Sequence, residues 1–178
     1  MKRNTTTKAQ RKLIRDLEEL WSLLSLDYTN ITNYEKTSRT LHLERMKRHL
    51  IIGEVVVQYT LIDECLNIRL CKYFFGANMD SIRIWKTTKF QNFNYHVLEQ
   101  LSLLEKLRFV RSFVKIPKSI NGDIERINAL RNGLVHALFP ENLKKSKPIY
   151  KGKSIFSIEG INLFIEDMGK ITAFFLHR

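Results

Sequence analysis

The chain has 178 residues, which is long enough for one domain with a buried core and short for two. Hydrophobic residues make up 44% and charged residues 27%, a balance typical of a folded globular protein rather than a disordered one. Lys and Arg outnumber Asp and Glu by 30 to 18, so the formal net charge is +12. This charge favours a polyanionic partner such as nucleic acid or an anionic membrane surface, whereas seven Gly and three Pro provide few turns for an all-β fold.

The sequence carries no pattern of a secreted or membrane-spanning protein. The N-terminus is basic and threonine-rich, without the apolar core of a signal peptide, and the apolar run 50–57 is short and interrupted by Gly53 and Glu54. Cys65 and Cys71 lie six residues apart on one predicted helix, so they cannot bridge within it, and two thiols alone make no zinc site. We therefore expect a cytoplasmic protein with no metal or other cofactor and no membrane partner.

Helical periodicity dominates the first half of the chain. Residues 1–8 are predicted to be a flexible basic arm, and a helix with a leucine face is predicted over 8–26, followed by a polar loop over 27–37. A long helix is predicted over 38–75, and Gly76 suits its C-terminal stop. This long helix is apolar nearly all round, so it must be covered on both sides, by its own domain or by a second copy.

The second half is predicted to continue the helical pattern. The stretch 78–94 fits either a short helix or an irregular loop, and a helix is predicted over 93–114. Near the C-terminus, a small β-hairpin is predicted over 149–158 and a last helix over 159–176. The sequence thus predicts an all-α fold of about five helices in a single domain, with at most a minor hairpin.

Residues 121–140 predict the helix that carries the candidate site. Asn121 or Asp123 can cap its first turn, and Pro140 ends it. At about 100° per residue, Arg131 projects inside the apolar arc of this helix. A guanidinium cannot lose its charge, so Arg131 must be paired, hydrogen-bonded or facing a wet cleft; the alternative is an arginine whose head reaches solvent from a packed helix. A separate polar stripe holds Glu125, Asn128, Asn132 and His136.

Within this helix stands the run Arg131-Asn132-Gly133-Leu134-Val135-His136, an Arg-x4-His pattern with Asn directly after the Arg. It resembles the motif of the HEPN superfamily, whose members carry Arg-x(4 to 6)-His, often as Arg-Asn-x-x-x-His. The helical layout of residues 40–178 is also similar to that of the family, while the motif itself is confined to residues 131–136. The resemblance implies a HEPN-like helical bundle and a metal-independent endoribonuclease of the toxin or phage-defence kind. It also implies a homodimer in which two motif helices meet, with RNA as substrate and an antitoxin or another defence protein as a further partner.

The two motif residues supply the chemistry that RNA cleavage without a metal requires. A histidine, with an ordinary pKa of about 6.5, can act as base for the 2′-hydroxyl or as acid for the leaving oxygen. A fixed guanidinium suits the negative charge of the phosphoryl transition state. His136 and Arg131 are therefore the candidate catalytic residues, the product is expected to be a 2′,3′-cyclic phosphate, and Asn132 would orient the imidazole or bind a phosphate oxygen. The alternative function is a non-catalytic HEPN-like module for dimerisation or RNA binding.

Further candidates rest on weaker patterns. An acidic side chain supports the site in many HEPN proteins, which makes Asp63 and Glu64 on the long helix candidate partners for Arg131; the alternative is that both are solvated helix charges. A run of basic residues near the C-terminus is either a contact surface for the RNA backbone or a solvated loop. These basic residues are Lys144, Lys145, Lys147, Lys151 and Lys153.

Overall fold

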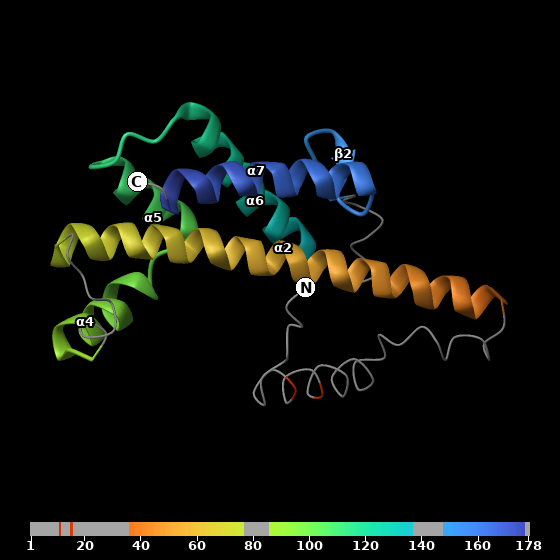
Figure 1. Ribbon diagram of the computed structural model, residues 1–178, viewed down its shortest axis with the longest axis horizontal. Helices are drawn as coiled ribbons and strands as arrows, with labels where there is room; N and C mark the ends of the chain where they lie inside the picture. Colours follow the sequence, from red (N-terminus) through yellow and green to blue (C-terminus); the bar gives the residue numbers. More distant parts are fainter. Residues whose placement is uncertain (1–10, 12–14, 16–35, 77–85, 137–147, 177–178) are drawn as a thin grey trace, which may run out of the picture. The chain divides into compact units, whose positions relative to one another are not determined.

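The computed structural model describes residues 11, 15, 36–76, 86–136 and 148–176 (Figure 1). The chain divides into two compact units, Met1–Leu50 and Ile51–Arg178, and the site lies in the second. The described residues are mostly helical with one small antiparallel sheet, which confirms the predicted all-α fold class. None of the described helices is both long and apolar enough to cross a membrane. The single domain stays a prediction, and the helix expected over 8–26 falls almost wholly outside the described residues.

The long predicted helix is confirmed as α2, Lys36–Phe75. It ends at Gly76, whose backbone has φ 95°, a conformation that glycine adopts without steric cost. The Gly76 N–H donates to the Lys72 carbonyl oxygen at 3.0 Å, which closes the last turn. One face of α2 is fully buried in the second unit and includes Val55, Ile62, Leu66 and Leu70.

The helix predicted over 93–114 is wrong as a single element. The structure instead has α4 (Thr88–Phe93), a π-helical turn η2 (Asn94–Leu98) and, after a break, α5 (Leu103–Arg111). The break comes from a capping box: the Ser102 hydroxyl accepts from the Glu105 N–H, and the Glu105 carboxylate accepts from the Ser102 N–H at 2.8 Å. These bonds satisfy backbone groups at a helix start, so a new helix begins although the apolar spacing runs on.

The motif helix, α6, spans Lys118–His136 and begins one turn earlier than predicted. The Pro117 carbonyl accepts from the Asn121 N–H at 3.0 Å, so Asn121 already lies inside the helix, where its side chain donates to Glu125 at 2.8 Å. Neither Asn121 nor Asp123 is the cap. The predicted end at Pro140 lies outside the described residues. The buried face of α6 is the predicted one, with Ile124, Ile127, Leu130 and Leu134.

The predicted hairpin is confirmed as β1 (Ile149–Tyr150) paired antiparallel with β2 (Lys153–Ser154). Lys151 and Gly152 form the two-residue turn and both have positive φ, 46° and 80°. The last helix, α7, covers Ile158–Leu176, in agreement with the prediction.

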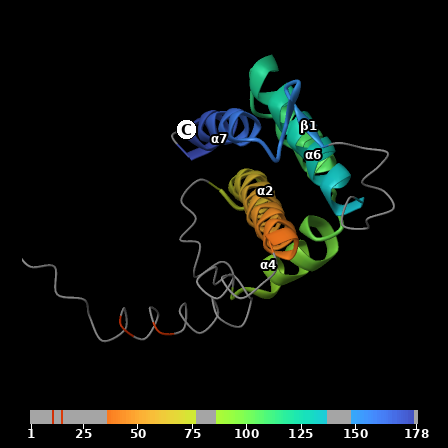
Figure 2. The same cartoon turned by 90° about the vertical axis from the view of Figure 1, so that its right-hand side faces the viewer.

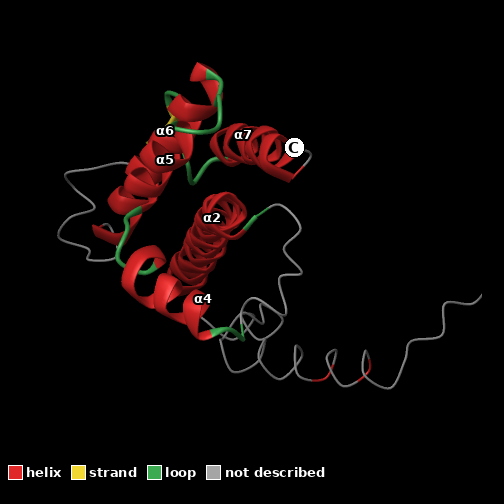
Figure 3. Ribbon diagram, turned by 90° about the vertical axis from the view of Figure 1, so that its left-hand side faces the viewer, coloured by secondary structure: helices red, strands yellow, loops and turns green. Residues whose placement is uncertain are grey.

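The elements of the second unit surround the part of α2 that lies in it. Figures 2 and 3 look nearly along α2 and show α6 and α7 on one side of it and α4 on the other. One hydrophobic core joins them, with side chains from α2, η2, α5, α6, the hairpin and α7. Arg69 of α2 also donates to the Phe175 carbonyl oxygen in the last turn of α7. The second unit is therefore built around α2, and the motif helix packs within that arrangement.

Candidate functional site

The motif arginine is held by an aromatic ring and an amide. Arg131 is half-buried near the end of α6, and its guanidinium carbon lies 5.1 Å from the centre of the Tyr59 ring on α2. Its Nη1 donates to Asn132 Oδ1 at 3.2 Å. No carboxylate among the described residues forms an ion pair with Arg131. The guanidinium is thus oriented without being neutralised, which leaves its charge for an anionic ligand.

Tyr59 is the contact that the sequence did not reveal. Its hydroxyl lies 3.5 Å from Asn128 Oδ1, at the outer limit of a hydrogen bond, so one ring touches two residues of the motif helix. Burial raises the pKa of the Tyr59 phenol, while the nearby Arg131 charge opposes that rise. Tyr59 therefore stays neutral near pH 7. In the sequence, Tyr59 is one residue of an apolar stripe of α2 and indicates only core packing. Its contact with Arg131 depends on how α2 and α6 cross, which the spacing within α2 does not indicate.

The other motif residues occupy the end of α6. Asn132 is exposed and accepts from Arg131, so its amide oxygen is engaged by its neighbour in this arrangement. His136 is the last residue of α6. Its side chain lies outside the described part of the chain, so its role stays a prediction.

Asp63 has a different partner from the one expected. Its two oxygens accept from Lys106 Nζ at 2.8 and 2.7 Å, and Oδ2 also accepts from Asn67 Nδ2 at 3.3 Å. Lys106 lies on α5 and is only 4% exposed, so Asp63, rather than water, compensates the positive charge of the Lys106 ammonium group. The structure therefore pairs Asp63 with Lys106 and not with Arg131, because α5 places a buried lysine next to the carboxylate. Glu64, exposed on the adjoining face of α2, has no ion pair with Arg131 either.

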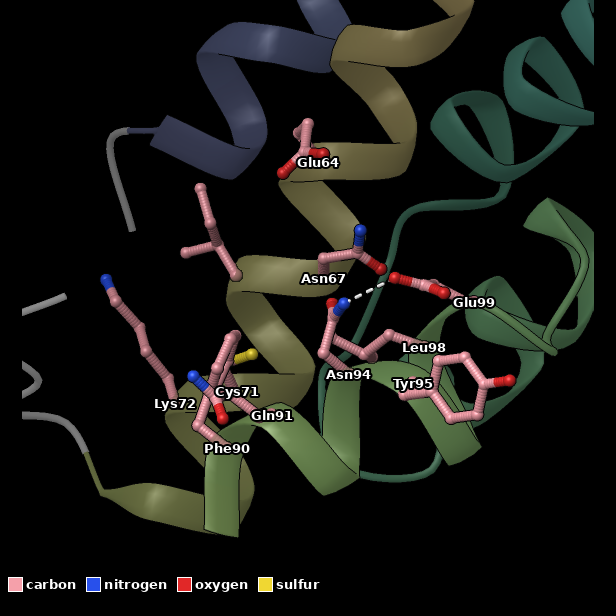
Figure 4. A pocket seen from close by; sticks show the side chains of 11 residues that line it. Glu64, Asn67, Cys71, Lys72, Phe90, Gln91, Asn94, Tyr95, Leu98 and Glu99 are labelled. Carbon is pink, nitrogen blue, oxygen red and sulfur yellow. Dashed lines mark hydrogen bonds between the residues drawn. The ribbon is translucent and has the colours of Figure 1, made fainter. Parts of the chain in front are cut away.

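A groove runs along α2 from Tyr59 towards Lys72. It consists of two adjoining hollows of about 910 and 490 Å³ that share Glu64, Asn67, Asn94, Leu98 and Glu99. The larger hollow lies between α2 and the α4–η2 segment (Figure 4). The smaller one is lined by Tyr59, Asp63 and Lys106 among others. The ring that supports Arg131 is thus also a wall of the groove.

The predicted basic surface has a different character where it is described. Lys144, Lys145 and Lys147 lie outside the described residues. Lys151 bridges two buried carboxylates, Asp123 of α6 (3.2 Å) and Asp167 of α7. Lys153 pairs with Glu159 at 2.7 Å on the exposed side of the hairpin. Lys151 is consequently a structural residue, whereas Lys153 is paired only with an exposed carboxylate at the surface.

The Lys151 bridge belongs to a larger network around the buried carboxylates of Asp123 and Asp167. Arg126 also pairs with Asp123, and Lys170 pairs with Asp167 at 3.1 Å. The Tyr150 hydroxyl donates to Asp167 at 2.8 Å. Burial raises the pKa of Tyr150, and this hydrogen bond to Asp167 raises it further. Tyr150 is therefore a packing residue and not a surface ring for stacking on a base.

Within the described ranges, no three His, Cys, Asp or Glu side chains stand together as metal ligands. Neither a protein-family model, nor a curated protein, nor a solved structure matches the chain.

Proposed function

We propose that this protein is a metal-independent endoribonuclease of the HEPN type, acting as a toxin or in phage defence. Arg131 and His136 are its catalytic residues, RNA is its substrate and the active form is a homodimer. The observation that carries the proposal is the setting of Arg131: half-buried, with its guanidinium over the Tyr59 ring, and without a carboxylate partner among the described residues. A purely structural arginine at such a site would be expected to pair with an acid, as Arg126 on the same helix does.

In the proposed reaction, His136 takes the proton of a 2′-hydroxyl, whose oxygen attacks the adjacent phosphorus. The bond from phosphorus to the 5′-oxygen breaks, and His136 of a second copy protonates that oxygen. The products are a 2′,3′-cyclic phosphate and a free 5′-hydroxyl. Arg131 stabilises the additional negative charge on the phosphoryl oxygens in the transition state, and Tyr59 keeps the guanidinium in place.

The test is cleavage of RNA by the purified full chain in EDTA. His136→Ala and Arg131→Ala should each lower the cleavage rate about a hundredfold or more, since each removes a proton-transfer or charge-stabilising group. An RNA carrying 2′-O-methyl at the cut site should resist, because the nucleophile is blocked. Arg111→Ala is the matched control, as Arg111 is an exposed arginine on α5 away from the motif. Circular dichroism verifies that every variant is folded.

Full activity of His136→Ala, or efficient cleavage at a 2′-O-methyl position, would exclude this mechanism. If the wild type binds RNA or dimerises without cleaving RNA under any of these conditions, the non-catalytic HEPN-like module becomes the better assignment.

A further inference from the structure

The groove beside the motif has walls suited to a flat, apolar ligand. Ile68 of α2 and Leu98 of η2 line it, together with the rings of Phe90 and Tyr95. Tyr95 is 62% exposed and sits on η2, a π-helical turn, which is a rare element that is frequently found at functional sites. A volume of about 910 Å³ lies in the range of small-molecule pockets. An exposed ring at the edge of such a groove can serve as a stacking platform for a nucleobase.

The middle of the groove has more hydrogen-bond acceptors than donors. Asn67 extends from α2 towards Asn94 and Glu99 on the η2 side, and Glu64 lies nearly one turn before Asn67 on α2 (Figure 4). The Asn94 amide donates to Glu99 at 2.6 Å, and the Asn67 amide nitrogen donates to Asp63, so each of these amides has one of its two N–H donors in use. Asn67 Oδ1 is buried and has no hydrogen-bond partner among the described residues. The carboxylate of Glu64 likewise has no ion pair in this part of the chain.

This excess of acceptors selects among the four RNA bases. Guanine is the base whose Watson–Crick edge offers two adjacent donors, N1–H and the N2 amino group, which one carboxylate can accept together. Adenine and cytosine each present one amino group beside an acceptor, and uracil presents one N–H between two acceptors. Near a carboxylate those acceptors would be left facing negative charge, which is costly.

The groove also lies where a substrate strand would pass. Tyr59 lines its smaller hollow and also lies beneath the Arg131 guanidinium, so the groove begins beside a residue in contact with the proposed catalytic arginine. From Tyr59 to Asn67 is about 12 Å along α2, at about 1.5 Å per residue. Lys72 lines the far end and is exposed, in a position to contact a phosphate of the same strand.

We propose that this groove is a base-recognition site for guanine in single-stranded RNA, in which Glu64 accepts from N1–H and the N2 amino group. It deepens the proposed function, on which it rests for RNA as the substrate, by naming the base that selects the cleavage site.

Equilibrium binding tests this site without any cleavage. The probes are fluorescein-labelled 2′-O-methyl oligonucleotides of adenine in which a single guanine is moved through the sequence, with anisotropy as the readout and the full wild-type chain as the protein. One guanine position should tighten binding about tenfold or more over the all-adenine probe. Inosine at that position, which lacks the N2 amino group, should recover only part of the gain.

Two variants and a matched control assign the effect to the groove. Glu64→Gln keeps the shape but can accept only one of the two bonds, so it should abolish the difference between guanine and inosine. Ile68→Trp should fill the groove and weaken binding of the guanine probe to the level of the all-adenine probe. Glu166→Gln, at an exposed acid on α7 outside the groove, should leave the guanine preference unchanged.

The two proposals fail in different ways. Equal binding of all probes, or a guanine preference that survives in Glu64→Gln and Ile68→Trp, overturns the groove assignment even if RNA is cleaved through a 2′-hydroxyl. A guanine preference that depends on Glu64, in a protein that does not cleave RNA, supports the groove and overturns the nuclease.

Discussion

Arg131 is expected to depend on Tyr59 for its orientation, since its guanidinium carbon lies over the ring, 5.1 Å from the ring centre. Tyr59→Phe keeps the ring and should leave the rate of RNA cleavage within about twofold of wild type. Tyr59→Leu removes the ring and should lower the rate roughly two- to thirtyfold, in keeping with about 0.5–2 kcal/mol for a cation–π contact. Equal rates for the two variants would show that Tyr59 does not position the arginine.

Lys151 is the other cation whose surroundings decide its role. Lys151→Met leaves the 4%-exposed Asp123 and the 1%-exposed Asp167 with one cation fewer. The expected loss is about 2–3 kcal/mol in the free energy of unfolding, below the cost of a fully orphaned charge because Arg126 and Lys170 remain. Urea unfolding at pH 7 measures it. Lys153→Met is the matched control and should change stability by less than about 1 kcal/mol, since its pair with Glu159 is exposed.

The same interaction should give stability a defined pH dependence. Burial raises the pKa of Asp167, but hydrogen bonds from Lys151, Tyr150 and Lys170 outweigh this, so the pKa lies below its ordinary value of 3.8. The ionised carboxylate is therefore favoured by folding, and its contribution is present above pH 3.8 and lost as the pH falls below that value. The stability difference between wild type and Lys151→Met should shrink in that acidic range. A difference that stays constant down to pH 2 would contradict this assignment.

At the scale of single residues, the sequence indicates which side chains are candidates for the site, but it does not indicate which side chains contact them. The motif run and its unusual arginine are visible from helical spacing alone. The partners of these groups are not visible from spacing. Asp63 forms an ion pair with Lys106, Lys151 forms an ion pair with the buried Asp167, and the Tyr59 ring lies under the Arg131 guanidinium. Each of these outcomes depends on which helices cross and where, and residue spacing within one element carries no information about that.

Among the helices and strands, α7 offers the sharpest test of packing. A Cβ added at Gly160 would collide with the backbone carbonyl of Ser154, whereas one added at Gly169 on the same helix meets nothing within 4 Å. Gly160→Ala should therefore destabilise the protein by about 1–3 kcal/mol or more, because backbone must move. Gly169→Ala should stabilise it by about 0.5–1 kcal/mol, as expected for glycine to alanine inside a helix. Thermal unfolding of the pair checks both signs, and the same sign for both would refute the close approach of α7 to the hairpin.

The elements that the sequence predicted well have strong local signals at their ends. Gly76 stops α2, and the Lys151–Gly152 turn closes the hairpin, in each case through a backbone conformation that the residue type favours. The helix predicted over 93–114 failed because its apolar spacing continues through the break. The Ser102–Glu105 capping box is the local sequence signal that marks this break.

At the scale of the whole molecule, the dimer expected from the apolar character of α2 stays a prediction. Several apolar side chains of α2 in the second unit are exposed, among them Val56 (40%), Val57 (62%) and Leu61 (39%). Light scattering at micromolar concentration should give about twice the 21.1 kDa of one chain. Val57→Asp should shift the mass towards one chain, because a charge in an apolar interface is costly, while Ile158→Asp on α7 should not. A wild-type mass near 21.1 kDa would refute the dimer.

The buried network around Lys151 also bears on how the molecule opens. Asp123, Lys151 and Asp167 belong to α6, the hairpin turn and α7. If one of these elements separates, the charged side chains of the others lose an ion-pair partner. Partial opening at this end of the molecule is therefore expensive, and α6, the hairpin and α7 should exchange their amide hydrogens as one cooperative unit. The short α4 buries none of its residues and has no such tie, so its amides should exchange at a lower free energy. The wall of the groove formed by α4 can then loosen while the helix carrying Arg131 stays closed.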